Sequence, residues 1–107
     1  MHDYDGYSVI EISGRMDNDA AELRDATSEK VAAGVRALIV EMGGVRLTNS
    51  IGLGMLVEAY KAADAGGARF ILASVQPQVR TVLAYTKLDT IFRICDSRED
   101  AVAALSE

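Results

Sequence analysis

Apolar and polar positions alternate along residues 7–14, YSVIEISG, where β-branched side chains are also frequent. This period of two predicts a strand. Residues 16–35 change to a helical spacing, with Asp19 and Glu22 placed as an N-cap and its partner. Gly34 suits the end of this helix. The chain is therefore predicted to begin with a strand followed by a helix.

The same succession of strand and helix continues along the rest of the chain. Further strands are predicted at residues 35–42, 68–74 and 91–94. Helices are predicted after residue 50, from Pro77 and from Ser97. Because strands alternate with helices, we predict an α/β fold with a mostly parallel or mixed sheet of about four to five strands and four helices. Residues 1–107 are expected to form a single domain.

The helix after residue 50 has one apolar face. This face is formed by Leu53, Leu56, Val57 and Tyr60. Tyr60 is therefore expected to face the core rather than bind a ligand. Met55 and Cys95 are likewise expected to be packing residues.

The negative net charge of the chain argues against nucleic acids and anionic membranes as partners. The formal net charge is −5, whereas a nucleic acid or an anionic membrane attracts a basic surface. No apolar run approaches the roughly 20 residues that span a bilayer, so we expect no membrane insertion. A single cysteine cannot form an internal disulfide, and a cytoplasmic location is therefore the simplest expectation.

The residues needed for metal binding or catalysis are scarce. His2 is the only histidine and Cys95 the only cysteine, whereas zinc sites need three or four such ligands. Ser50 and Cys95 also lack a histidine base other than His2. We therefore expect no cofactor and no enzymatic activity.

The segment TNSIGLG, residues 48–54, interrupts the regular pattern between a strand and a helix. Ser50 could act as the N-cap of that helix, with the glycines allowing backbones to pack closely. Alternatively, Ser50 could accept a phosphate, because a helix N-terminus favours negative charge. Gly52 and Gly54 would then let another protein approach closely. The spacing alone leaves both hypotheses open.

Residues 38–94 resemble the STAS-domain anti-sigma factor antagonists. That family typically shows a strand, a D-S-S/T-G-L-G turn, an amphipathic helix ending in GG, a second strand, a proline-led helix and a Leu-Asp…Phe segment. In this chain the corresponding residues are Gly52-Leu53-Gly54, the GG of residues 66–67, QPQVRTVL at residues 76–83 and KLDTIFRI at residues 87–94. Residues 13–26 also resemble the family's first strand–helix junction.

The resemblance implies a partner switch. The unphosphorylated antagonist would bind an anti-sigma factor that is also a serine protein kinase, and would thereby release a sigma factor. The kinase would phosphorylate the antagonist to end binding, and a serine phosphatase would reset it. The family's phosphoacceptor falls on Ser50. The implied partner-binding residues are Thr48, Asn49, Ser50, Ile51, Gly52, Leu53 and Gly54, together with Asp17.

Two positions depart from the family pattern. Asn49 stands where the family has aspartate, and Ile51 stands where a second Ser or Thr is usual. Loss of the aspartate removes a charge beside the phosphoacceptor, which puts kinase recognition or the identity of the partner in doubt. The alternative function is a STAS subunit that docks to a transporter or a signalling scaffold.

Overall fold

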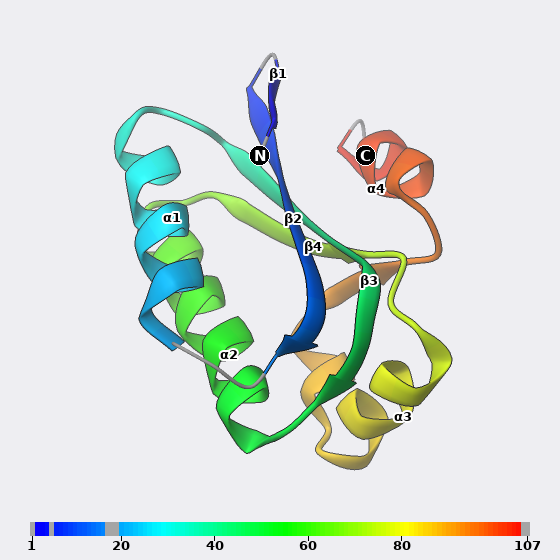
Figure 1. Cartoon of the computed structure of the whole chain (residues 1–107). Helices are drawn as coiled ribbons and strands as arrows, with labels where there is room; N and C mark the ends of the chain where they lie inside the picture. Colours follow the sequence, from blue (N-terminus) through cyan, green and yellow to red (C-terminus); the bar gives the residue numbers. More distant parts are fainter. Residues whose placement is uncertain (1, 5, 17–19, 106–107) are drawn as a thin grey trace.

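A five-stranded mixed sheet organises the chain, with strand order β1-β2-β3-β4-β5 (Figure 1). The structure, a computed structural model, describes residues 2–4, 6–16 and 20–105. In chain order the elements are β1 (His2–Tyr4), β2 (Tyr7–Met16), α1 (Ala20–Ala32), β3 (Ala37–Thr48), α2 (Ser50–Ala65), β4 (Arg69–Ala73), α3 (Pro77–Tyr85), the 3-10 helix η1 (Leu88–Thr90), β5 (Arg93–Cys95) and α4 (Arg98–Ala104).

The strands from β2 to β5 are parallel, whereas β1 pairs antiparallel with β2. The predicted α/β fold with a mixed sheet and four helices is therefore confirmed. The strand β1 was not predicted, because three residues are too few to show a period in the sequence.

The two faces of the sheet bury two separate apolar clusters. Along β3, Leu38, Val40 and Met42 face one cluster, and α1 and α2 pack together on that side (Figure 1). Ile39 lies between them in sequence and faces the other cluster, beneath α4. This alternation follows from the period of two along a strand. Complete burial of each such side chain contributes about 1.5–3 kcal/mol.

Three aromatic rings pack α2 against β4 and against the residue that precedes β5. The ring of Tyr60 meets Phe70 and Phe92 edge-on, with centroid distances of 6.1 and 5.7 Å. The prediction that Tyr60 faces the core is therefore confirmed. Met55 and Cys95 are also buried, as predicted.

Two predicted details of the elements change. The strand predicted at residues 35–42 was expected to end at Met42, but β3 continues to Thr48. Its pairing with β2 is irregular along this continuation, as described below. The predicted cap at Asp19 lies outside the described residues.

Candidate partner-docking site at the start of α2

The helix α2 begins directly after β3, and Asn49 is its N-cap. The Oδ1 atom of Asn49 accepts a hydrogen bond from the Gly52 backbone N–H at 3.0 Å. Ser50 is the first helical residue and its side chain is exposed. The hypothesis that Ser50 caps the helix is therefore wrong, because the preceding residue already fills that role.

The capping role also gives a structural reason for Asn49. Asparagine and aspartate are about equally good N-caps, because each offers a short side-chain oxygen to the free N–H groups of the first turn. Asparagine in place of the family's aspartate therefore keeps the start of α2 while removing one negative charge beside Ser50.

The junction between β3 and α2 has an outer and an inner side. Asn49, Ser50 and Ile51 are exposed, and Ile51 keeps 50% of its surface accessible. Gly52 is buried, and Leu53 packs against the core cluster. Of the predicted partner-binding residues, three consecutive ones therefore form the outer surface.

Two further predicted residues flank this surface. Thr48 is half-buried, and its hydroxyl donates to the Asn49 carbonyl oxygen at 3.4 Å. Gly54 lies one turn along α2 and is partly exposed. Asp17, also predicted to contact the partner, lies outside the described residues.

Gly54 has no packing reason to be a glycine. Apart from its chain neighbours and the backbone of α2 itself, a Cβ atom added at this position would find no heavy atom within 4 Å. Glycine inside a helix costs about 1 kcal/mol relative to alanine. The fold would therefore accept alanine at Gly54, and the glycine leaves this part of the surface unusually flat.

The electrostatics of this helix start favour an anion. The first turn of α2 contains no acidic residue, although acidic side chains are favourable there. Its backbone N–H groups and the dipole of a 16-residue helix both favour negative charge at this end. In the free protein, a phosphate on Ser50 would therefore interact favourably with the N-terminus of α2.

The pairing between β2 and β3 contains a bulge before α2 begins. Glu11 pairs with Glu41 and Ser13 pairs with Gly44, so two steps along β2 correspond to three along β3. Beyond the bulge, β3 continues beside β2 as far as Thr48. A second shift follows, because Gly14 pairs with Val45 and Arg15 pairs with Leu47. Two irregularities in the pairing therefore precede the point at which Asn49 and Ser50 leave the sheet.

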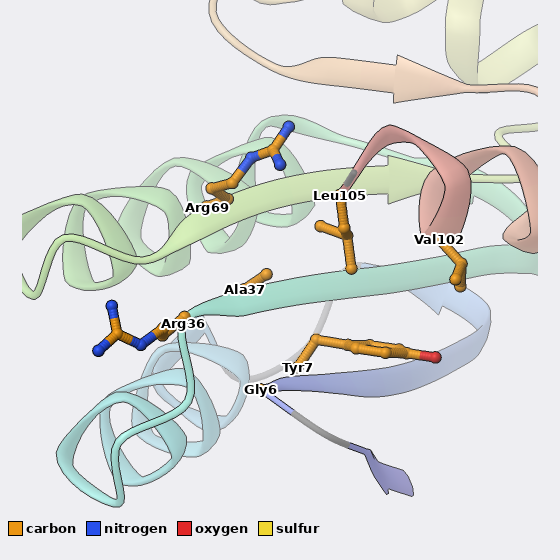
Figure 2. A pocket seen from close by; sticks show the side chains of 7 residues that line it. All are labelled: Gly6, Tyr7, Arg36, Ala37, Arg69, Val102 and Leu105. Atoms are coloured by element: carbon orange, nitrogen blue, oxygen red, sulfur yellow. The ribbon is translucent and has the colours of Figure 1, made fainter. Parts of the chain in front are cut away.

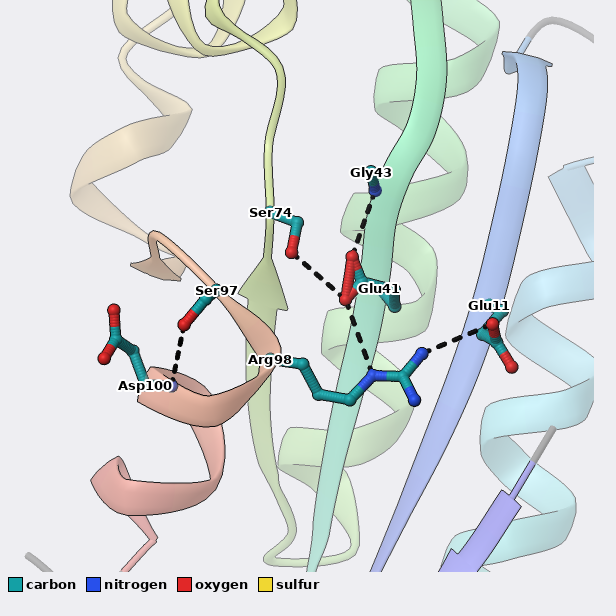
Figure 3. Close-up of polar contacts among 7 residues, drawn as sticks. All are labelled: Glu11, Glu41, Gly43, Ser74, Ser97, Arg98 and Asp100. Atoms are coloured by element: carbon teal, nitrogen blue, oxygen red, sulfur yellow. Dashed lines mark hydrogen bonds and ion pairs between the residues drawn. The ribbon is translucent and has the colours of Figure 1, made fainter.

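Side chains hold the bulge in place at Gly43. Its backbone N–H donates to Glu41 Oε1 at 3.2 Å (Figure 3). Its carbonyl accepts from Gln76 Nε2 at 2.6 Å. The Ser74 hydroxyl donates to Glu41 Oε2 at 3.1 Å, from a residue with a φ of 60°. Glu41 thus links the bulge in β3 to the loop that follows β4.

Arg98, the first residue of α4, extends this network. Its Nε lies 3.6 Å from Glu41 Oε2, and its Nη2 lies 3.3 Å from Glu11 Oε2 (Figure 3). This network was not predicted from the sequence. Its one visible signal was Glu41, a charged residue directly after the apolar run of β3.

Comparison with known proteins identifies the family. The STAS domain family matches residues 1–101, and the chain belongs to this family. A STAS-domain containing protein of Pseudomonas aeruginosa (strain UCBPP-PA14) is 35% identical over 87 residues, which are 80% of this chain and 85% of that protein. BtrV of Bordetella bronchiseptica, described as an anti-sigma factor antagonist, is 27% identical over 97% of this chain and 90% of its own length.

Solved structures share the fold. An anti-sigma factor antagonist from Mycobacterium paratuberculosis superposes with a TM-score of 0.81 at 28% identity, covering 99% of this chain and 91% of that one. A sulfate transporter family protein from Wolinella succinogenes has a TM-score of 0.78 at 18% identity, covering 92% of this chain and 84% of that one. The fold is therefore common to different uses, and the residues at the start of α2 must decide between them.

Residues 2–4, 6–16 and 20–105 form no helix that is both long and apolar enough to cross a membrane. They also contain no group of three or more His, Cys, Asp or Glu side chains that could hold a metal ion.

Proposed function

We propose that this STAS domain is an anti-sigma factor antagonist that acts by partner switching. Its unphosphorylated form binds an anti-sigma factor that is also a serine kinase, and a sigma factor is thereby released. Phosphorylation of Ser50 ends binding, and a phosphatase restores it. The protein acts in the cytoplasm through binding, without an enzymatic activity of its own.

One observation carries this proposal: the Ser50 hydroxyl is exposed at the start of α2 and is not needed as the cap. A kinase can therefore reach it without dismantling the helix. The antagonists from Bordetella and Mycobacterium, which match nearly the whole chain, support the same class of function.

The physics of the switch follows from the surroundings of Ser50. A phosphate adds about −1.5 to −2 charges. In the free protein this charge meets the favourable N-terminus of α2 and remains hydrated. In a complex the same charge lies beside the exposed Ile51, within a surface that binding would remove from water. Phosphorylation therefore raises the free energy of the complex more than that of the free protein.

The test is the intact mass of the protein purified from its native host, before and after phosphatase treatment. We expect a phosphatase-sensitive addition of about 80 Da, one phosphate. Cleavage after Arg46 and Lys61 gives a peptide of residues 47–61 with three hydroxyl side chains, those of Thr48, Ser50 and Tyr60. Fragmentation should place the phosphate on Ser50.

Two variants in the same host serve as controls. Ser50→Ala should abolish the added mass, and Thr48→Ala should leave it unchanged. Absence of the modified species under all growth conditions would contradict the switch. Co-purification with a transporter or a scaffold would then favour the alternative, a constitutive STAS docking subunit.

A further inference from the structure

A hollow lies at the end of the sheet opposite Ser50, between the starts of three parallel strands and α4 (Figure 2). Its volume is about 330 Å³, at the lower end of the range of small-molecule sites. The residues that line it are Gly6, Tyr7, Arg36, Ala37, Arg69, Val102 and Leu105.

The floor of this hollow is one row across the sheet. Tyr7 pairs with Ala37, and Ala37 pairs with Arg69, so the three side chains project on the same face of β2, β3 and β4. Val102 and Leu105 close the opposite side from the end of α4. Figure 2 shows the Tyr7 ring beneath these two side chains, which makes the middle of the hollow apolar.

Two arginines border one end of the hollow. In Figure 2 the Arg36 guanidinium points outward from this end, and the Tyr7 hydroxyl lies toward the other end. Arg69 Nη2 donates to the carbonyl oxygen of Ala104 at 3.0 Å, which holds its guanidinium at the end of α4. A guanidinium carries five N–H donors, so others are available to a ligand.

Neither Arg36 nor Arg69 forms an ion pair within the part of the chain that the structure describes. The chain has 16 acidic residues against 11 lysines and arginines. Unlike these two arginines, Arg80 pairs with Asp96 at 3.2 Å and Arg98 pairs with two glutamates.

We propose that this hollow binds a small amphipathic carboxylate, an aliphatic or aryl acid. Its carboxylate would accept hydrogen bonds from Arg69 and, once the exposed Arg36 side chain turns toward the hollow, from Arg36. Planar guanidinium groups suit the geometry of a carboxylate. Its apolar body would lie between the Tyr7 ring and the side chains of Val102 and Leu105. The site lies at the other end of β3 from Ser50, so it is separate from the proposed partner-docking surface.

The test is an amide NMR titration of the full chain with octanoate. We expect saturable shifts at residues 6–7, 36–37, 69 and 102–105, and none at residues 48–54. Two probes separate the contributions: 1-octanol has the apolar body without the charge, and inorganic phosphate has charge without the apolar body. Both should bind far more weakly than octanoate.

Variants then test the arginines. Arg36→Gln and Arg69→Gln should each weaken octanoate binding about tenfold, the effect of losing one charge-assisted contact. Arg36→Gln is the safer variant, because Arg69 also holds the end of α4. Arg80→Gln, an exposed arginine elsewhere, is the matched control and should leave binding unchanged.

Three results would overturn the proposal. They are the absence of saturable shifts with octanoate at millimolar concentration, equal binding of 1-octanol or phosphate, and unchanged octanoate affinity in Arg36→Gln. The variants do not touch Ser50, so failure here leaves the partner switch unaffected, and the reverse also holds.

Discussion

The helices α2 and α4 start in the same way and then diverge. Each follows a strand, and each has a side-chain cap at 3.0 Å: Asn49 accepts from the N–H of Gly52, and Ser97 accepts from the N–H of Asp100. The first turn of α4 then carries Glu99 and Asp100, whereas the first turn of α2 carries no acid. The start of α4 therefore has acidic side chains that interact favourably with the helix dipole, whereas the start of α2 has none.

The two helices also differ in where the side chains of their first residues point. In α4 the first residue, Arg98, reaches inward to Glu41 and Glu11. In α2 the first two residues, Ser50 and Ile51, are exposed. The comparison shows one helix start whose polar groups serve the fold and another whose side chains are available to a partner.

The largest expected effect is a loss of partner affinity when Ser50 at the start of α2 is phosphorylated. Phosphorylation there should weaken binding to the anti-sigma factor at least a hundredfold, about 2.7 kcal/mol, because the added charge must be desolvated in the complex. Calorimetry with phosphorylated and unphosphorylated protein measures this. Ser50→Ala should bind constitutively, and Ser50→Asp should bind weakly. Full affinity of the phosphoprotein would show that the charge lies outside the interface.

A second, smaller effect should come from Glu41. Glu41→Ala removes the acceptor for the Gly43 N–H and the Ser74 hydroxyl, and it leaves Arg98 with one carboxylate fewer. We expect the free energy of unfolding to fall by about 2 kcal/mol, because hydrogen bonds to a largely buried charged group are lost. Urea denaturation measures the change.

The matched control for Glu41 is Glu11→Ala. Its ion pair with Arg98 is half-exposed, so the expected loss is below about 1 kcal/mol. Equal losses in the two variants would show that Glu41 contributes no more than a surface charge. The bulge would then be held by the backbone alone.

The third expected effect is on the free energy of unfolding when the N-cap of α2 or of α4 is removed. Asn49→Ala and Ser97→Ala should each lower the free energy of unfolding by about 1 kcal/mol, because each leaves an N–H of the first turn unsatisfied. Ser50→Ala should leave stability unchanged or slightly raised, because alanine is the better helix former. Thermal and urea unfolding of the three variants measure this. A loss in Ser50→Ala equal to that in Asn49→Ala would contradict the assignment of the cap.

Local rules predicted most of the fold because most of its elements obey them. The period of two in β2, the proline at the start of α3 and the Ser97 cap each depend on neighbouring residues alone. Local rules could not decide which residue caps α2, because Asn49 and Ser50 are adjacent and are both good N-cap residues. Which of them caps α2 depends on where β3 ends.

The end of β3 depends on contacts that no local pattern contains. The bulge at Gly43 is held by Glu41 and by Gln76, which lies 33 residues away along the chain. The hollow beside Tyr7 similarly combines residues of three strands and α4. Sequence period predicts which face of a strand is buried, but not which distant side chains meet at its ends.

The smallest expected effect is at Gly54, where stability and binding should separate. Gly54→Ala should raise the free energy of unfolding by about 0.5–1 kcal/mol, since alanine favours the helix and its Cβ meets no atom. The same methyl group should weaken partner binding if the partner's backbone lies against this turn. Gly66→Ala, at the C-cap of α2, is the contrasting control, because its Cβ would overlap Val31 and should destabilise the fold. A more stable Gly54→Ala protein with full partner affinity would restrict the docking surface to Asn49, Ser50 and Ile51.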